Sequence, residues 1–211
     1  MSGALRLKSK RRWLHERRSD PYFLLSKKEG YRSRASFKLK QILDEYRIIR
    51  PGDIVLDIGC APGGWLQVAS EEVGDSGMVV GVDLKRVEDL GLENVKTLVL
   101  DVFDERFVNR VLDASGEKFN VILSDLSPNM SGIYELDHVK QIEMVERVIN
   151  VSRDLLKRNG SIVIKVFEGE YSDRVEKRAF RMFRFVKRVK PKASRKGSSE
   201  HYLVAKFFKG F

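Results

Sequence analysis

A lysine inside an apolar strand is the first residue of this chain that could do chemistry. Lys165 stands within the run from Ile162 to Phe167, whose other members are apolar, as in a buried strand. A charged amine is costly to bury unless it is paired or loses its proton. A lysine at a sheet edge can extend its amine into water, but this strand is expected in the sheet interior. We therefore predict that Lys165 removes or polarises a proton.

An aspartate follows the preceding strand. Asp125 comes after the run from Phe119 to Ser124, and Pro128 then breaks the β pattern. In a parallel α/β sheet this position lies at the carboxyl edge, where ligands bind. We predict that Asp125 orients the Lys165 amine and lies beside a bound ligand.

A glycine-rich turn indicates what that ligand is. Residues 57–65 read Asp-Ile-Gly-Cys-Ala-Pro-Gly-Gly-Trp and follow a short apolar strand. Glycines there let the main chain turn tightly and approach a ligand closely. The spacing of Gly59 and Gly63 is not the G-x-G-x-x-G of dinucleotide sites, and no Walker A lysine is present. A ligand with an adenosine and no phosphates remains, and S-adenosylmethionine fits this description.

Aspartates end three consecutive predicted strands. Asp57 precedes the glycine turn, Asp83 ends the second strand and Asp101 follows the third. Asp83 is placed to accept the ribose hydroxyls of a nucleoside, and Asp101 to meet the adenine edge. Each acid could instead cap the next helix. Three in succession beside a glycine turn favour one shared crevice.

Alternating strand and helix patterns must position these residues. The expected elements, in chain order, are a helix at 34–47, a strand at 53–58, a helix at 63–73, strands at 78–83 and 95–100, a helix at 104–113, a strand at 119–125, a helix at 136–158, a strand at 161–167, a helix at 172–182 and an antiparallel pair at 184–190 and 201–208. This alternation predicts an α/β fold, a parallel sheet with helices on both faces.

Charge is distributed unevenly along the 211 residues, whose formal net charge is +10. Residues 1–50 carry 15 Lys and Arg against 5 acids, residues 51–173 carry 12 against 23, and residues 174–211 carry 13 against 2. Basic flanks of this strength predict an anionic polymer as partner. A membrane surface could attract the same charge, but no long helix with a clean apolar face accompanies it. We expect a basic arm at 1–30 and a single domain at 31–211.

Several classes of protein are not expected. No apolar run reaches the roughly 18 residues of a membrane span, and the N-terminal residues are too charged for a secretory signal. One cysteine predicts no internal disulfide, and three scattered histidines predict no metal site. The default expectation is a cytoplasmic protein without a metal.

Five motifs in order give the chain a specific resemblance. They begin at Arg32, Gly59, Ser124, Lys165 and Ser198. From about Tyr31 to Phe208 the chain resembles the FtsJ/RrmJ-like ribose 2'-O-methyltransferases. The resemblance implies a Rossmann-like fold, with a seven-stranded, mostly parallel sheet whose last strand is antiparallel. It also implies catalytic residues Lys38, Asp125, Lys165 and Glu200, and contacts to S-adenosylmethionine from Gly59, Gly63, Trp65, Asp83, Asp101 and Asp125.

The same resemblance implies a function and further roles. Lys38 would hold the target nucleotide and, by like-charge repulsion, favour the neutral form of the Lys165 amine, while Glu200 would position one of the two lysines. The substrate would be RNA and not DNA, most simply a uridine of large-subunit (23S-type) ribosomal RNA, methylated by a monomer. The alternatives are the anticodon loop of transfer RNA, a non-catalytic RNA-binding assembly factor, and a small-molecule methyltransferase.

Overall fold

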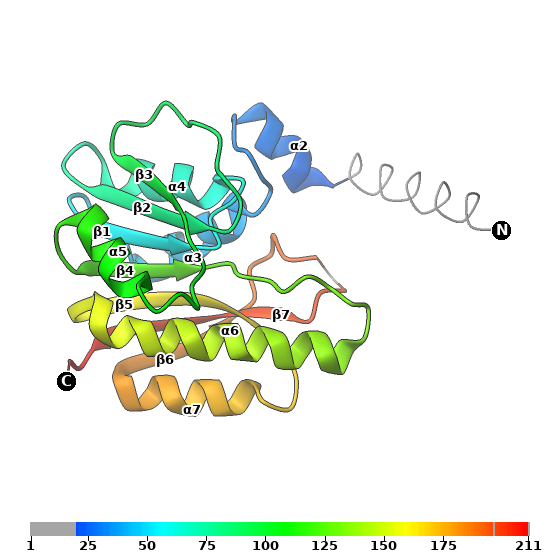
Figure 1. The fold of residues 1–211 in the computed structure, drawn as a ribbon. Helices are drawn as coiled ribbons and strands as arrows, with labels where there is room; N and C mark the ends of the chain where they lie inside the picture. The colour runs from blue at the N-terminus through cyan, green and yellow to red at the C-terminus, as the bar shows by residue number, and fades with distance from the viewer. Residues whose placement is uncertain (1–19, 196, 211) are drawn as a thin grey trace.

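A seven-stranded sheet forms the centre of the molecule. The computed structural model describes residues 20–195 and 197–210. The strand order is β3-β2-β1-β4-β5-β7-β6, and helices cover both faces (Figure 1). The strands are β1 (Ile54–Ile58), β2 (Met78–Asp83), β3 (Val95–Val99), β4 (Phe119–Ser124), β5 (Leu156–Phe167), β6 (Phe183–Val189) and β7 (Glu200–Phe208).

The pairing pattern explains where a ligand can bind. Strand β1 pairs in parallel with both β2 and β4, so the strand order reverses at β1. Strand β5 continues the parallel sheet beside β4, and β7 inserts antiparallel between β5 and β6. A crevice forms at such a reversal, outside the carboxyl ends of the strands. The carboxyl ends of β1 and β4 therefore mark the expected site.

Two buried clusters hold the helices to the sheet. Successive side chains of a strand point to opposite faces, and Val55 accordingly belongs to one cluster and Leu56 to the other. The helices α2 (Pro21–Lys28), α3 (Ser36–Tyr46) and α4 (Gly64–Val73) contribute to the Val55 cluster. The helices α5 (Phe107–Ser115), α6 (Tyr134–Leu155) and α7 (Ser172–Met182) contribute to the Leu56 cluster.

The fold predicted from the sequence is confirmed. Every strand expected from the apolar runs is present, and β7 alone runs against the rest of the sheet. The predicted pair at the end of the chain forms between β6 and β7, joined by the loop at 190–199.

One boundary differs from the prediction. Strand β5 begins at Leu156, directly after α6, and not at 161. The predicted strand began after Asn159 and Gly160, residue types that favour turns. Asn159 instead adopts φ 65° within the strand, and the β4–β5 register shifts nearby, between the pairs of Phe119 and Val121. The strand thus absorbs the turn-forming residues as an irregularity.

One helix was not predicted. Residues 1–30 were expected to be a basic arm, and residues 1–19 of it lie outside the described residues. Helix α2 lies inside that range, with Pro21 at its first turn and the Asp20 carboxylate accepting the main-chain N–H groups of Tyr22 and Phe23. Asp20 also pairs with Arg34. The helix was missed because the region was interpreted from its positive charge, although Asp20 followed by Pro21 is a typical helix start.

Candidate active site

The two residues singled out first in the sequence form an ion pair. Lys165 lies in β5 and is 6% exposed. Its Nζ donates to the main-chain oxygen of Asp125 at 2.7 Å and lies 3.3 Å from the Asp125 Oδ1. The buried amine therefore has the partner that its burial demands. The prediction that Asp125 orients Lys165 is consistent with this geometry.

A buried glutamine fixes the main chain around Lys165. Strand β4 pairs with β5 only as far as Ile164, so the main-chain groups beyond that point lack a partner on the β4 side. Gln141 of α6 takes its place, donating to the Lys165 main-chain oxygen at 2.7 Å and accepting from the Phe167 N–H at 3.1 Å. Satisfying these groups holds the end of β5 rigid. No sequence pattern had indicated that Gln141 holds the end of β5.

The other two residues implied by the resemblance form a second ion pair. Lys38 of α3 pairs with Glu200 at the start of β7, and both side chains are 12% exposed. Ser194 also donates to the Glu200 carboxylate, at 3.1 Å. Among the described residues Glu200 thus pairs with Lys38 and not with Lys165, and its role in positioning Lys38 stays a prediction. Each of the two lysines thus has a different acid as its ion-pair partner.

A close approach between two helices places Lys38. The Ser36 hydroxyl donates to the Gly64 main-chain oxygen at 2.9 Å. A Cβ at Gly64 would lie 2.3 Å from the Ser33 hydroxyl oxygen and 2.7 Å from that of Ser36. Glycine at this position lets α3 dock against the start of α4. The glycine turn and the Lys38 helix are thus built as one unit.

Tyr202 links the two ion pairs. This β7 residue is fully buried and lies beside Lys165 in the antiparallel ladder. Its hydroxyl donates to the Asp125 Oδ1 at 2.7 Å, and its ring centroid lies 5.7 Å from the Lys38 Nζ. Burial raises the pKa of the Tyr202 phenol well above its ordinary value, so the hydroxyl keeps its proton and remains a donor. Sequence reasoning assigned Tyr202 no role.

We predict that Tyr202→Phe lowers kcat about tenfold, the order expected for loss of one hydrogen bond to a charged group. The KM for S-adenosylmethionine should change little, because the lost bond positions Asp125 and Lys165. Steady-state kinetics with an RNA substrate that lacks the modification measures both constants. Tyr22→Phe is the matched control, since its hydroxyl bonds Gln41 in the α2–α3 region. An equal loss in both variants would contradict a positioning role for Tyr202.

Trp65, a predicted cofactor residue, is buried behind the ion pairs, against Tyr202 and the start of α3. Its side chain is 3% exposed, its indole N–H donates to the Ala35 main-chain oxygen at 2.8 Å, and its ring packs on Tyr202 with centroids 5.7 Å apart. The Trp65 side chain therefore holds Tyr202 and α3 in place. Direct contact between Trp65 and a cofactor stays a prediction.

The glycine turn leaves no room for side chains. Gly59 has φ 84°, and a Cβ there would lie 2.8 Å from the Leu126 side chain; Gly63 has φ 109°. Both conformations favour glycine. Next to the turn a groove of about 480 Å³ is lined by Arg32, Ala61, Pro62, Lys85 and neighbouring residues. The turn thus presents main chain to an open groove.

Asp57 is a buried acid without a hydrogen-bond partner for its side chain among the described residues. It lies at the end of β1 and is fully buried. Burial, followed by repulsion from Asp125 and Asp83, raises the pKa of Asp57 well above its ordinary value. An unpaired buried acid beside two others is unfavourable unless a cationic ligand joins it.

The two remaining acids lie on the neighbouring strands. Asp83 accepts the main-chain N–H groups of Ala61 and Lys85, each at 2.9 Å, and so ties the end of β2 to the glycine turn. Leu100 donates to the Asp83 main-chain oxygen at 3.1 Å, which brings Asp101 next along the edge. Asp101 is exposed and accepts the Phe103 N–H at 2.9 Å. The predicted row of acidic strand ends is present at one sheet edge.

These residues fit S-adenosylmethionine. The cofactor carries positive charge on its sulfonium and amino groups and has no phosphates. The glycine turn allows close approach of main chain, and the carboxylates of Asp83 and Asp125 supply negative charge at the strand ends, joined by that of Asp57 when a cationic ligand favours its ionised form. Asp83 and Asp101 would meet the nucleoside. The individual contacts remain predictions.

Membrane and metal features can be stated for the described part of the chain. Within residues 20–195 and 197–210, no helix is long and apolar enough to cross a membrane. In the same ranges, no group of three or more His, Cys, Asp or Glu side chains gathers as metal ligands would.

The sheet order and the acidic edge at its reversal define a class. The fold matches fibrillarin from Aeropyrum pernix, solved with bound S-adenosyl-L-methionine, with a TM-score of 0.58, 17% identity and coverage of 83% of this chain and 75% of fibrillarin. The protein is a Rossmann-like, S-adenosylmethionine-dependent methyltransferase.

Within that class, the chain belongs to the FtsJ-like methyltransferase family, whose model matches residues 31–208. It is 43% identical over 200 residues to ribosomal RNA large subunit methyltransferase E of Methanothermobacter thermautotrophicus, covering 95% of both chains. Its identity to the Halorubrum lacusprofundi protein of that name is 46%, over 89% of this chain and 70% of the relative. A Plasmodium falciparum structure described as a ribosomal RNA methyltransferase has a TM-score of 0.76 at 27% identity, over 86% of this chain and all of that one. The predicted family is confirmed.

Proposed function

We propose that this protein transfers a methyl group from S-adenosylmethionine to a ribose 2'-hydroxyl of large-subunit ribosomal RNA. The observation that carries the proposal is the buried Lys165–Asp125 pair, joined through Tyr202 to Lys38–Glu200, at the sheet edge that holds the glycine turn. The relatives named ribosomal RNA large subunit methyltransferase E support the choice of RNA.

Lys165 would act on the acceptor hydroxyl. S-adenosylmethionine supplies a methyl group already activated for in-line attack, so the protein must mainly position the acceptor and manage its proton. As the acceptor oxygen bonds to the methyl carbon, the carbon–sulfur bond breaks and the hydroxyl proton leaves. Lys165 takes this proton when its amine is neutral, or stabilises the developing oxyanion when it is an ammonium. Asp125 and Tyr202 hold the amine in place.

Lys38 and its neighbours would receive the target nucleotide. A groove of about 220 Å³ is lined by Arg34, Ala35, Lys38, Arg195, Ser198 and Glu200. Cations at its wall suit a phosphate or ribose of the acceptor strand. Glu200 restrains the Lys38 amine, so that its charge is offered at one fixed position.

Ribosomal RNA is preferred over transfer RNA because of the relatives of matching length. The chain covers 95% of the Methanothermobacter protein, whose name specifies ribosomal RNA. We propose that the protein acts as a monomer in the cytoplasm. The modified base is proposed to be uridine.

The proposal is tested by supplying S-adenosylmethionine with a labelled methyl group to four substrates. These are large ribosomal subunits lacking the modification, the naked RNA of those subunits, bulk transfer RNA and DNA. We expect label in the ribosomal substrate, at a nucleotide whose 3'-phosphodiester bond resists alkaline cleavage. Label only in transfer RNA would reject the ribosomal assignment. RNA binding without label in any pool would favour a non-catalytic assembly factor.

A further inference from the structure

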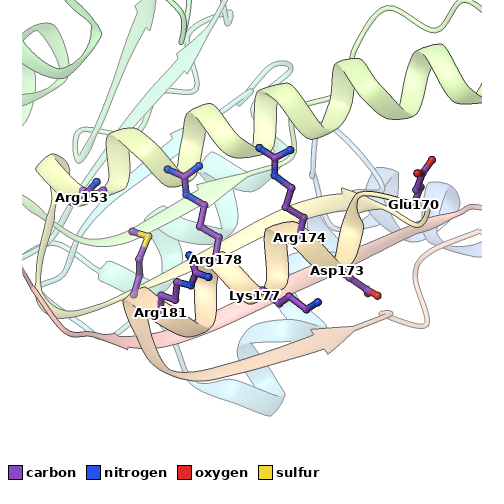
Figure 2. A pocket seen from close by; sticks show the side chains of 8 residues that line it. Arg153, Glu170, Asp173, Arg174, Lys177, Arg178 and Arg181 are labelled. Atoms are coloured by element: carbon purple, nitrogen blue, oxygen red, sulfur yellow. The ribbon is translucent and has the colours of Figure 1, made fainter.

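Three grooves join into one basic surface away from the catalytic residues. The largest, about 860 Å³, lies between α6 and α7 and is lined by Arg153, Arg174, Lys177, Arg178 and Arg181 among others. Figure 2 shows the arginines of α7 extending towards α6. A second groove, of about 430 Å³, shares Arg153 with the first. A third groove, of about 470 Å³, shares Lys157 and Arg158 with the second. We call this continuous surface the basic belt.

The part of the belt formed by Lys118, Lys157 and Arg158 lies at the edge of the sheet opposite the active site, whereas the α7 groove extends back to Glu170 and Asp173, just beyond the carboxyl end of β5. Lys118 directly precedes β4, and Lys157 and Arg158 are the second and third residues of β5. Asp125 and Lys165 lie at the other ends of these same strands. The eight residue steps from Lys157 to Lys165 correspond to roughly 25 Å of extended chain.

The belt is strongly and locally positive. Twelve Lys and Arg residues line its three grooves, against the three acids Asp53, Glu170 and Asp173. Glu117 pairs with Lys157 and Glu146 with Arg174, at 2.8 Å and 3.1 Å. By contrast, residues 51–173 as a whole carry more acids than cations. A solvated surface of mixed sign does not produce such a concentration.

The charges of the belt are presented to solvent in two ways. Lys206 and Lys209 donate to main-chain oxygens at the ends of α3 and α7, which are neutral acceptors and leave the lysine charge uncompensated. The side chains of Arg50, Lys118 and Arg158 are exposed and make no hydrogen bond or ion pair among the described residues, although Arg50 is close enough to Asp53 to act on its charge. These three can therefore be neutralised without breaking an internal hydrogen bond or ion pair.

We propose that the basic belt is a second RNA-binding surface, which holds phosphates of the substrate far from the methylated nucleotide. This inference rests on the proposed function. The phosphate backbone supplies most of the affinity of such contacts by counterion release, without reading sequence. Because Lys118 and Arg158 of the belt lie at the sheet edge opposite Lys165, one RNA can engage both only if it extends around the protein, as folded ribosomal RNA does. A short strand at the active site does not reach these residues.

The test compares two triple variants with equal charge change. Arg50→Gln/Lys118→Gln/Arg158→Gln neutralises the belt. Lys96→Gln/Arg106→Gln/Arg110→Gln neutralises three exposed cations around β3 and α5, outside the belt. Each is assayed on assembled large subunits that lack the modification, on naked full-length large-subunit RNA and on a short fragment trimmed around the target nucleotide. Circular dichroism and thermal unfolding establish that both variants are folded.

For full-length RNA we expect the belt variant to lose about tenfold in kcat/KM, and its slope of log affinity against log salt to fall by about 2 to 3. On the short fragment it should match the wild type, and the control variant should match the wild type on both. Equal activity and slope of belt variant and wild type on full-length RNA would overturn the proposal. So would equal losses on both substrates, or a loss seen with assembled subunits and not with naked RNA, which would indicate a protein partner. If the wild type methylates no RNA, the proposed function fails instead, while the salt slope still reports on the belt.

Discussion

Lys165→Ala should lower the rate of methyl transfer by roughly two to four orders of magnitude, the range for loss of a positioned proton-transfer group. The affinity for S-adenosylmethionine should change little, because the substitution leaves in place the glycine turn and the acidic strand ends that are predicted to bind the cofactor. Asp125 keeps its bond from Tyr202 and so stays in position. Single-turnover methylation gives the rate, and calorimetry gives the dissociation constant.

Two further variants sharpen this result. Lys165→Arg keeps the positive charge but accepts no proton at neutral pH. If it stays as slow as Lys165→Ala, proton removal is the main role; recovery of rate would assign electrostatic stabilisation instead. Lys187→Ala removes an exposed lysine from β6 and controls for net charge. Near wild-type methylation by Lys165→Ala would remove Lys165 from the catalytic group.

Asp57→Asn should weaken S-adenosylmethionine binding and stabilise the protein without its cofactor. The substitution keeps the shape of the side chain and removes the charge that a cationic ligand would offset. Loss of one charge-assisted interaction corresponds to about a tenfold or greater rise in the dissociation constant. Because ligand binding supports the native state by mass action, the same variant should gain less thermal stability from added cofactor. Calorimetry and thermal unfolding measure both effects.

The pH dependence of stability gives the sign of this effect. The pKa of Asp57 is raised in the folded protein, so the native state binds the proton more tightly than the unfolded chain. Stability is therefore lost as pH rises from the ordinary aspartate pKa through the raised one. Relative to wild type, Asp57→Asn should become more stable over that interval. Asp75→Asn, at an exposed turn, is the control, and parallel curves for all three proteins would contradict an energetic cost at Asp57.

The patterns that predicted the fold also explain what they missed. Apolar runs with acidic ends identified the strands and Asp125, because burial and strand direction leave a local trace in the sequence. Lys165 was found for the same reason, as a charge where none should be. Lys38 and Glu200 came only from the family resemblance, since nothing local distinguishes them from surface residues.

Other features depend on contacts between distant segments. The role of Tyr202 follows from the β5–β7 register, and that of Gln141 from the point where β4 and β5 separate. The basic belt gathers Arg50, Lys118 and Arg158 only because parallel strands begin at one edge. The sequence displayed basic flanks but not this surface. Helix α2 was missed because its lysines were taken as part of an arm.

Strand β7 has a consequence for when the enzyme first becomes active. Glu200 and Tyr202 lie on this strand, which inserts between β5 and β6 after both have been made. A chain that has not yet added β7 has neither the partner of Lys38 nor the donor to Asp125. The arrangement of the two ion pairs is therefore complete only once the last strand has been synthesised and paired with β5.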